Sequence, residues 1–442
     1  MTALDLRLRQ ALQPWRTAPA WYIAFSGGLD SSVLLHLLAD WARHETLPPL
    51  RALHVEHGLQ PAAQAWPAHC AEVCQRLGIE LEVLRVRVEA GASLEQAARQ
   101  ARYAAFAQCL EPGALLLTGQ HRDDQAETLL LRLLRGAGVR GLAAMPRQRP
   151  LGAGSLLRPL LDCPRGELEA YAAAHGLSWV EDPSNRSEQF SRNFLRRQIL
   201  PRLAERWPQT SAALARTAAH LGEAQMLLDE LAEQDLAAVR QASGIAWLPV
   251  PSLPLAPIAA LSEARQRNLL RHWLAPLTRL PDSEHWAGWR DLRDAGVDAT
   301  PIWRLTDGEL QRSEGRIWWL AGAWLQPPPA LDMPWPVGAQ EVSLPGNGLL
   351  RLRGVQVHEN LRVRYRQGGE RLFIEGRGQR DLKRLLNEQG VPSFVRGRLP
   401  LLYAGDELLV VANLDLPGTA AQSLQWLAPG QLSEEQRAMI EV

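Results

Sequence analysis

Short apolar segments alternate with amphipathic helical patterns up to about Pro201, and this alternation restricts the fold more than any other feature of the sequence. The apolar segments are typical of strands and lie at residues 21–25, 50–55, 81–88 and 114–119. The helical patterns lie between and after them, at residues 31–43, 63–77, 93–110 and 123–135. A β-α-β-α order of this kind predicts a parallel sheet with helices on both faces and right-handed crossovers.

The pattern changes beyond Trp207, where long helical segments replace the alternation. Residues 211–239 and 263–274 have the spacing of amphipathic helices. A hairpin follows, with strands on either side of Ser313-Glu314-Gly315. This stretch therefore predicts a mainly helical region that carries at least one pair of strands.

Five prolines between residues 325 and 336 predict a linker, and the sequence after it is rich in strands with one helix near 380–389. A chain of 442 residues is long enough for two or three domains. We therefore expect an α/β fold with three parts: an N-terminal parallel-sheet domain (1–206), a mainly helical middle domain (207–326) and a small α+β C-terminal domain (337–442).

The segment Ser-Gly-Gly-Leu-Asp-Ser-Ser (26–32) joins the first strand to the first helix. Two glycines at the end of a strand allow a sharp turn and let a bound group approach the main-chain N–H donors. The free N–H groups at the start of the next helix favour a phosphate, and Ser26, Ser31 and Ser32 add hydroxyl donors. Asp30 would repel a phosphate unless a divalent cation lies between them, or else it only stabilises the first helical turn. The segment predicts a phosphate loop that differs from the Walker and dinucleotide-binding signatures.

An acidic group follows the fourth strand, in His-Arg-Asp-Asp-Gln-Ala-Glu (121–127). Asp124 and Glu127 are three residues apart and so share a helix face near its start, next to Asp123. The carboxyl ends of parallel strands meet at the sheet edge where such folds bind ligands. Three carboxylates there suit magnesium and a cationic substrate, although a favourably charged helix start is the alternative.

Several motifs together resemble known proteins. SGGxDS is similar to the pyrophosphate loop of the N-type ATP pyrophosphatases, which cleave ATP between its α and β phosphates and transfer AMP to an oxygen. This resemblance implies that the N-terminal parallel-sheet domain (1–206) is of the adenine nucleotide α-hydrolase type. The larger set resembles the tRNA(Ile)-lysidine synthase family over nearly the whole chain. It comprises SGGLDSS, H-x-x-HGL, ARxxRY, QHxDDQAET, RGAGVRGL, LLRPLL (156–161), WVEDPSN (179–185), RNFLRRQILP (192–201) and residues 366–408.

The resemblance implies an ATP-dependent ligase that joins L-lysine to C2 of the wobble cytidine in the CAU anticodon of tRNA(Ile). The reaction would pass through an adenylated cytidine and release AMP and diphosphate. The product, lysidine, changes the codon that is read from AUG to AUA. ATP and Mg²⁺ are the cofactors that this implies.

The resemblance also implies roles for individual residues. Asp30 and Asp123 would hold magnesium, Asp124 and Glu127 would bind the lysine ammonium groups or accept the amine proton, and Arg102 would contact ATP or the adenylated intermediate. Arg102 is equally compatible with an exposed position on its helix. The ATP-binding residues would be Ser26, Gly27, Gly28, Leu29, Asp30 and Ser31, with His57 shaping the nucleotide pocket. The residues near the site without an assigned role are Arg192, Asn193 and Arg196.

Basic residues are concentrated near the C-terminus, with twelve Arg or Lys against five Asp or Glu between Arg351 and Pro400, although the net charge of the chain is zero. Such a cluster favours contacts with tRNA phosphates. The main candidates are Arg366, Arg371, Arg380, Lys383 and Arg384, with Arg364, Arg377, Arg396 and Arg398 beside them. The tryptophans of the middle region are expected in the core: Trp273, Trp286, Trp289, Trp303, Trp318, Trp319 and Trp324.

The closest alternative is a tRNA thiolase of the same superfamily, and cysteine usage distinguishes it from the ligase. A thiolase would carry sulfur on cysteines commonly paired as C-x-x-C. The four cysteines form no such pair, so we expect them to be inert core residues. A non-catalytic tRNA-binding protein is the other alternative, and the intact loop and acidic group count against it. The charged N-terminus and the lack of a long apolar segment predict a cytoplasmic protein without membrane contact, either a monomer or a homodimer.

Overall fold

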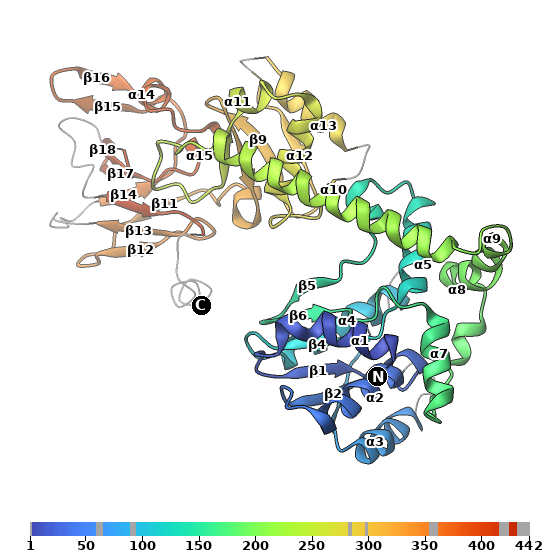
Figure 1. Ribbon diagram of the computed structural model, residues 1–442. Coiled ribbons are helices and arrows are strands. Elements are labelled where there is room, and N and C mark those ends of the chain that lie inside the picture. Colours follow the sequence, from blue (N-terminus) through green and yellow to red (C-terminus); the bar gives the residue numbers. More distant parts are fainter. Residues whose placement is uncertain are drawn as a thin grey trace. The chain divides into compact units, whose positions relative to one another are not determined.

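The computed structural model describes residues 2–58, 65–88, 94–281, 285–296, 299–352, 361–414 and 424–430. It divides into two compact units, Met1–Leu227 and Leu228–Val442 (Figure 1). The division falls within a helix of 30 residues, α10 (Thr210–Val239). Among the described helices, none is long and apolar enough to cross a lipid bilayer.

The first unit is built on a six-stranded sheet in the order β3-β2-β1-β4-β6-β5. Its strands are β1 (Trp21–Ala24), β2 (Leu50–Glu56), β3 (Glu80–Arg85), β4 (Leu115–Leu117), β5 (Gln148–Leu151) and β6 (Gly154–Leu157). All neighbours are parallel except β5, which pairs antiparallel with β6 at the edge. The predicted parallel sheet is confirmed, and the β5–β6 hairpin extends it.

Nine α-helices accompany this sheet in the described part of the first unit before α10. They are α1 (Ala3–Leu12), α2 (Leu29–His44), α3 (Trp66–Leu77), α4 (Leu94–Cys109), α5 (Arg122–Leu133), α6 (Val139–Leu142), α7 (Arg165–Ala174), α8 (Ser191–Phe194) and α9 (Leu200–Arg206). The four helices predicted between and after the strands correspond to α2, α3, α4 and α5, with ends that differ by a few residues.

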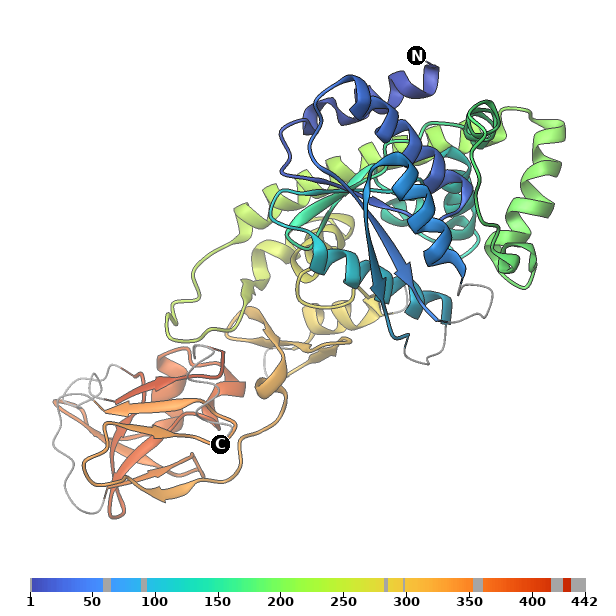
Figure 2. The same cartoon turned by 90° about the horizontal axis from the view of Figure 1, so that it is seen from below.

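Side-chain alternation along the strands explains the two helical layers. Trp21 and Ile23 point to the face covered by α1, α2, α3 and α7, whereas Tyr22 points to the face covered by α4. Figure 2 shows the strands between these layers. Because side chains of successive residues alternate between faces, a strand that is apolar throughout suits a sheet buried on both sides.

The strand order places a topological switch point beside β1. The chain runs from β1 outward to β2 and β3, then returns to place β4 on the other side of β1. The carboxyl ends of β1 and β4 are therefore neighbours. After β1 the chain continues toward β2, and after β4 it continues toward the opposite edge of the sheet. In open α/β sheets this is the usual position of a ligand.

The second unit contains two cores that share one strand. A four-stranded sheet packs with the helices α11 (Leu255–Ala259), α12 (Glu263–Leu274) and α13 (Trp286–Asp294). Its strands are β7 (Ser252–Pro254), β8 (Ile302–Arg304), β9 (Glu309–Ser313) and β10 (Arg316–Leu320). Along β10, Ile317 and Trp319 enter this core, whereas Trp318 and Leu320 enter the core of the C-terminal strands. The predicted hairpin around Glu314 is β9–β10.

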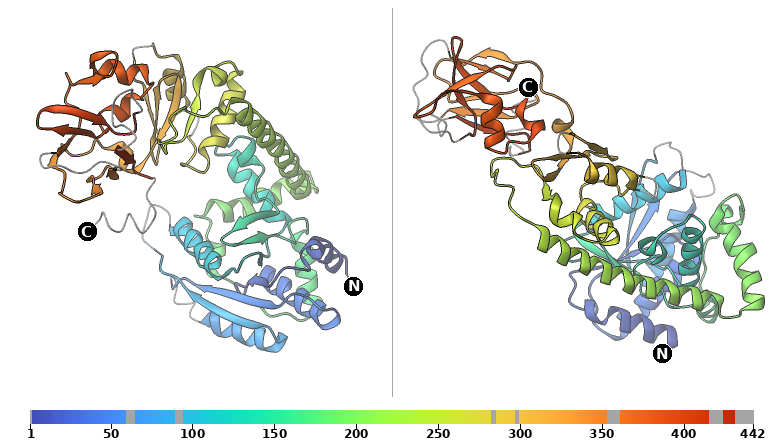
Figure 3. Two further views of the ribbon diagram at one scale, coloured as in Figure 1. Left: turned by 90° about the vertical axis from the view of Figure 1, so that its left-hand side faces the viewer. Right: turned by 90° about the horizontal axis from the view of Figure 1, so that it is seen from above.

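The C-terminal strands, coloured orange to red in Figure 3, form three small sheets in the order β11-β14-β17-β18, β12-β13-β19 and β15-β16. They are β11 (Asp332–Pro334), β12 (Glu341–Ser343), β13 (Leu349–Leu352), β14 (Leu361–Arg364), β15 (Arg371–Ile374), β16 (Gly378–Asp381), β17 (Leu401–Ala404), β18 (Glu407–Val411) and β19 (Leu424–Leu427). The helix predicted near 380–389 is α14 (Leu382–Glu388), and α15 (Ser393–Arg396) follows it.

The linker predicted at 325–336 is wrong for its last residues. Residues 332–334 form β11, which pairs with β14, and Trp335 is only 3% exposed in the core. Proline lacks an N–H donor but is tolerated at an edge strand, and β11 is the edge of its sheet. The prediction that the tryptophans of the middle region are core residues is confirmed for six of the seven. The seventh, Trp324, is partly buried against Phe394 and Trp426.

Candidate functional site

The segment between β1 and α2 forms a tight turn around Gly27. Its φ is +82°, and a Cβ at this position would lie 2.8 Å from Val180 Cγ2 and 3.0 Å from Cys70 Sγ. The Gly27 carbonyl accepts a hydrogen bond from Val180 N–H at 2.9 Å. Glycine is therefore required both by the backbone angle and by the lack of space.

The serines hold this turn from within. Ser26 Oγ lies 3.1 Å from Ser31 Oγ and accepts from the N–H of Gly28 at 3.3 Å, while Ser31 Oγ donates to the Gly28 carbonyl at 3.0 Å. Gly28 is the extended residue before the helix, and no side chain caps the first turn of α2. The N–H groups at this end are thus available to a bound anion, at the positive end of the helix dipole.

The loop after β4 touches the start of α2. A Cβ on Gly119 would lie 2.8 Å from the main-chain oxygen of Asp30 and 3.1 Å from Ser31 N. The two carboxyl-end loops at the switch point are therefore in contact, as expected from the motifs that follow β1 and β4.

Asp30 projects from the first turn of α2 and lacks a hydrogen-bond partner for one carboxylate oxygen. Oδ1 is buried and unpaired, and the nearest basic atom is His121 Nε2 at 3.7 Å. Burial raises the pKa of Asp30, and the charge of Asp124 adds to this, while His121 opposes it. An acidic oxygen in this position fits a hard cation such as magnesium, which prefers oxygen ligands.

His121 caps α5, a role that the sequence interpretation missed. Its Nδ1 accepts from the N–H groups of Asp123 and Asp124 at 3.2 and 3.4 Å, and the main-chain N–H of His121 donates to Asp124 Oδ2 at 3.1 Å. The other ring nitrogen, Nε2, lies 3.4 Å from Asp124 Oδ2 and 3.7 Å from Asp30 Oδ1. The sequence signal was available, since a polar residue three positions before an acidic one is typical of a helix start.

Asp123 links three segments of the first unit. Its Oδ2 accepts from Arg165 N–H at 2.8 Å and its Oδ1 accepts from the hydroxyl of Ser211 at 2.7 Å. Both oxygens thus accept hydrogen bonds, whereas Asp30, the other carboxylate predicted to hold a metal, keeps Oδ1 without a hydrogen-bond partner.

Asp124 and Glu127 form a buried ion-pair group with two arginines. Arg192 donates to Asp124 at 2.9 Å and Glu127 at 2.7 Å, and Arg196 donates to Asp124 at 3.0 Å and Glu127 at 2.5 Å. Glu127 is fully buried and Asp124 nearly so. Two carboxylates thus face two guanidinium groups, and this four-residue group is formally neutral.

The opposite charges of this group stabilise the ionised form of each partner. Although burial opposes ionisation of Asp124, His121 and the two arginines outweigh it and hold the pKa below its usual range. The pKa values of Arg192 and Arg196 are raised by the same carboxylates, against the effect of burial. Arg192 and Arg196 are four residues apart and therefore lie on one helical face, but nothing local in the sequence indicates their partners.

Asn193 supports a neighbouring loop. Its Nδ2 donates to the carbonyls of Ser184 and Ser187, both at 2.9 Å. The same stretch begins with Val180, which contacts Gly27. The predicted group of Arg192, Asn193 and Arg196 is therefore joined to the phosphate loop and to the acidic group.

A second basic cluster lies around α4. The guanidinium groups of Arg99 and Arg149 lie 5.0 and 4.9 Å from the ring centre of Tyr103. Burial alone would raise the pKa of Tyr103, but the surrounding arginines, Arg102 among them, lower it. Burial lowers the pKa of His57, and the charge of Arg102 adds to this effect. Arg102 therefore acts on the pKa values of both Tyr103 and His57.

The residues predicted to bind tRNA lie in the second unit. Arg371 is on β15, Arg380 on the paired strand β16, and Lys383 and Arg384 on the adjoining α14; all four are exposed. Arg366 is partly buried and paired with Glu370 at 3.2 Å. We call the four exposed residues the β15–α14 basic surface. The exposed ring of Phe373 lies on the same strand face as Arg371.

Arg398 does not belong with these residues. It is only 4% exposed, and its guanidinium donates to the Ala323 carbonyl at 2.6 Å and to Gln326. A contact between Arg398 and RNA was therefore wrongly predicted, since its charge is used inside the second unit.

Three family models match separate parts of the chain. A family model described as a PP-loop domain matches residues 1–203, one described as a TilS substrate binding domain matches 253–318, and one described as a TilS substrate C-terminal domain matches 361–426. The solved structure of U34-tRNA thiolase NcsA from Methanococcus maripaludis matches with a TM-score of 0.42 and 19% identity, over 50% of this chain and 78% of that chain.

Two curated relatives cover most of the chain. The tRNA(Ile)-lysidine synthase of Pseudomonas putida is 62% identical over 95% of this chain and 98% of its own length. That of Escherichia coli O157:H7 is 40% identical over 88% of this chain and 91% of its own length. Because both the domains and the full-length relatives agree, the chain belongs to the tRNA(Ile)-lysidine synthase family.

Proposed function

We propose that the chain joins L-lysine to C2 of the wobble cytidine in the CAU anticodon of tRNA(Ile), with ATP as the energy source. The observation that carries this proposal is the contact between the start of α2, after the glycine loop, and the loop after β4 that leads into the acidic start of α5. This contact supports an anion site beside a cation site, as a reaction between a nucleotide and an amine requires. The relatives named tRNA(Ile)-lysidine synthase support the same activity.

In the first step, the cytidine O2 attacks the α-phosphorus of ATP, a new P–O bond forms, and the bond to the β-phosphate breaks to release diphosphate. The N–H groups at the start of α2 and the hydroxyls of Ser26 and Ser31 would hold the β and γ phosphates. Asp30 would hold Mg²⁺, whose positive charge would offset the negative charge of the phosphates. Asp123 would join it only if it gave up one of its two hydrogen bonds.

In the second step, the lysine amine attacks C2, the C–O bond breaks, and AMP leaves with the former O2. The attacking amine must lose a proton, and Asp124 and Glu127 are our candidates to receive it or to bind the lysine ammonium. Both carboxylates already hold Arg192 and Arg196, so lysine must approach beside these guanidinium groups or displace one of them. Arg102 would contact the phosphate of ATP or of the intermediate.

The tRNA would be held partly by the β15–α14 basic surface. Its four basic side chains provide phosphate contacts, and Phe373 provides an exposed ring for stacking. Lysidine in the wobble position would change the codon read from AUG to AUA. With tRNA and ATP as substrates, we place the protein in the cytoplasm.

The thiolase alternative is less well supported. Such an enzyme needs reactive thiolates, whereas Cys70, Cys74 and Cys163 are buried and free. Burial raises the pKa of Cys70 to about 12 and that of Cys74 to about 11, so both thiols stay protonated at neutral pH. Cys109, which is partly exposed, also has its pKa raised by burial.

The direct test is incorporation of radiolabelled lysine. The purified protein with ATP, Mg²⁺ and unmodified tRNA(Ile) is expected to label that tRNA and to release one AMP per lysine, whereas methionine tRNA, which shares the CAU anticodon, stays unlabelled. Labelling from a sulfur donor instead of lysine would support the thiolase. Failure of both, with tRNA binding retained, would support a non-catalytic binding protein.

A further inference from the structure

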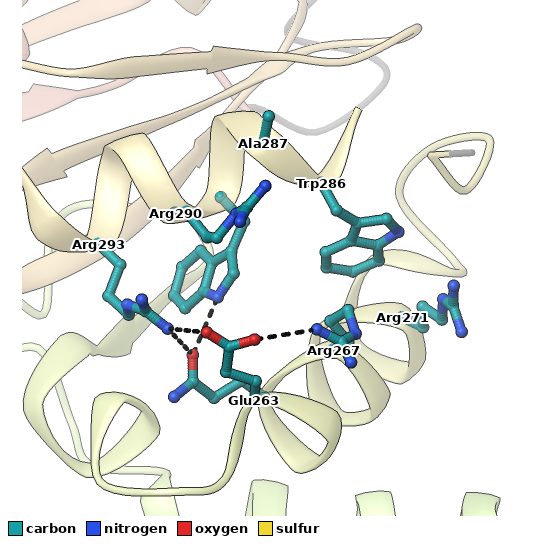
Figure 4. A pocket seen from close by; sticks show the side chains of 9 residues that line it. Glu263, Arg267, Arg271, Trp286, Ala287, Arg290 and Arg293 are labelled. Carbon is teal, nitrogen blue, oxygen red and sulfur yellow. Dashed lines mark hydrogen bonds and ion pairs between the residues drawn. The ribbon is translucent and has the colours of Figure 1, made fainter. Parts of the chain in front are cut away.

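A pocket of about 460 Å³ lies in the second unit between α12 and α13 (Figure 4). It shares no residue with the loop, the acidic group or the β15–α14 basic surface. Four arginines line it, two from each helix: Arg267 and Arg271 from α12, and Arg290 and Arg293 from α13. Glu263 is the one acidic residue among its lining residues.

The pocket carries an excess of positive charge. Glu263 lies 3.5 Å from Arg267 and 3.9 Å from Arg293, and Arg293 also pairs with Asp294 at 2.6 Å. Within the described part of the chain, neither Arg271 nor Arg290 forms an ion pair with a carboxylate. Two guanidinium groups at this pocket are therefore able to accept an anionic ligand.

Arg271 is held in place by an aromatic ring. Its guanidinium carbon lies 5.2 Å from the ring centre of Trp286, which is 7% exposed, and the two lie close together in Figure 4. Burial lowers the pKa of Arg271, and the charge of Arg267 adds to this. A fixed, planar guanidinium group presents several donors at once, which suits a phosphate.

The helices that carry these arginines are firmly anchored. Leu269, Leu270 and Trp273 of α12 and Trp289 and Leu292 of α13 are buried in the core of the four-stranded sheet. The indole N–H of Trp289 and the guanidinium of Arg293 both donate to Gln266 at 3.0 Å, which ties α13 to α12. The arginines thus project from a rigid base, with little ordering required on binding.

We infer that this pocket binds backbone phosphates of the tRNA substrate, through Arg271 and Arg290. Both helices fall within residues 253–318, which match the family model described as a substrate binding domain. The inference rests on the proposed function only in taking tRNA as the ligand, because it concerns binding and not ligation. It adds a contact site apart from the β15–α14 basic surface.

The experiment measures tRNA affinity over a range of salt concentrations. The double variant Arg271→Ala/Arg290→Ala is expected to bind unmodified tRNA(Ile) about tenfold more weakly at physiological salt, with a slope of log K against log salt reduced by about 1 to 2. The matched control is Arg304→Ala on β8, outside the pocket, whose side chain is 81% exposed and lies 3.8 Å from Glu309. Its affinity is expected to change by less than about twofold. A thermal melt verifies that both variants are folded.

A double variant with the affinity and salt slope of the control would overturn the inference. A second result would also overturn it: the unaltered protein binds inorganic phosphate, the double variant does not, and both bind tRNA with the same affinity. The pocket would then bind a free anion and not the tRNA backbone. Arg271→Lys, which keeps the charge but loses the planar fork, is expected to recover the salt slope and only part of the affinity. Lack of lysine incorporation by the unaltered protein would refute the proposed function but leave this binding result intact.

Discussion

Replacing Asp30 with asparagine is expected to lower lysine incorporation by at least about a thousandfold, because the variant loses a carboxylate beside the phosphate loop whose Oδ1 has no hydrogen-bond partner and fits a metal ion. Binding of tRNA should change little, since Asp30 lies in the first unit and far along the chain from the basic residues proposed to hold tRNA. The measurement is initial-rate incorporation of radiolabelled lysine at saturating tRNA and varied Mg²⁺.

Unfolding would not explain such a loss. Burial raises the pKa of Asp30, so the folded protein favours the protonated carboxyl, and at neutral pH the buried charge reduces the stability of the fold. Asparagine removes that cost, and the Tm of the variant is expected to be equal or higher. Asp40→Asn, near the other end of α2, serves as the control and should keep its activity. Unchanged turnover of Asp30→Asn would refute its role in holding the metal.

Replacing Glu127 with alanine is expected to destabilise the first unit by about 3–5 kcal/mol, because it removes a fully buried carboxylate and leaves two half-buried guanidinium groups with one carboxylate. For a unit of this size, that corresponds to a Tm lower by roughly 10 °C. The measurement is the first unfolding transition in a thermal melt and in urea.

The control is an exposed ion pair of the same unit. Arg165 and Glu169 are 2.9 Å apart on α7, and their side chains are 37% and 54% exposed, so Glu169→Ala should cost no more than about 0.5 kcal/mol. The double variant Glu127→Gln/Arg196→Gln removes one charge of each sign and should lose less stability than the two single changes added together. Strictly additive losses would show that Glu127 and Arg196 do not stabilise each other.

These experiments also separate structural from catalytic effects at Glu127. Glu127→Gln retains the shape of the side chain, so part of its stability should remain. If Glu127 binds the lysine ammonium, the KM for lysine should rise in this variant under conditions where it is folded. A KM for lysine that equals that of the unaltered protein would remove Glu127 from the lysine site.

The fold of the first unit was predictable because its signals are local. The apolar strands and the helical patterns between them are set by the spacing of neighbouring residues, and their order implies the parallel sheet. The turn at Gly27 was recognisable for the same reason, since a glycine pair between a strand and a helix is typical of a tight turn that binds phosphate. The contact between the loops after β1 and β4 followed from the rules for open α/β sheets.

The partners of the acidic group were not predictable from spacing. Arg192 reaches Glu127 across 65 positions of the sequence and Arg196 reaches it across 69, and no local pattern encodes such a contact. The sequence therefore suggested free carboxylates, whereas the structure has a neutral group of two carboxylates and two arginines. The proposed lysine site is for this reason less open than three neighbouring free carboxylates would suggest.

The second unit shows a related limit. The prolines at 325–336 predicted a linker, yet β11 pairs there with a strand some thirty residues away. On β10, Trp318 and Trp319 are adjacent in sequence but belong to different cores, which alternation explains only once both packing partners are known. Arg398 looked like a surface charge because its carbonyl acceptors are distant in the sequence.

The most direct test of the account is a crystal structure of the protein with Mg²⁺ and a non-hydrolysable ATP analogue. We predict that the β and γ phosphates lie against the N–H groups of residues 27–31, with the metal ion bound to Asp30. A triphosphate bound elsewhere, with this turn unoccupied, would contradict the proposed ligase and the role of every residue derived from it.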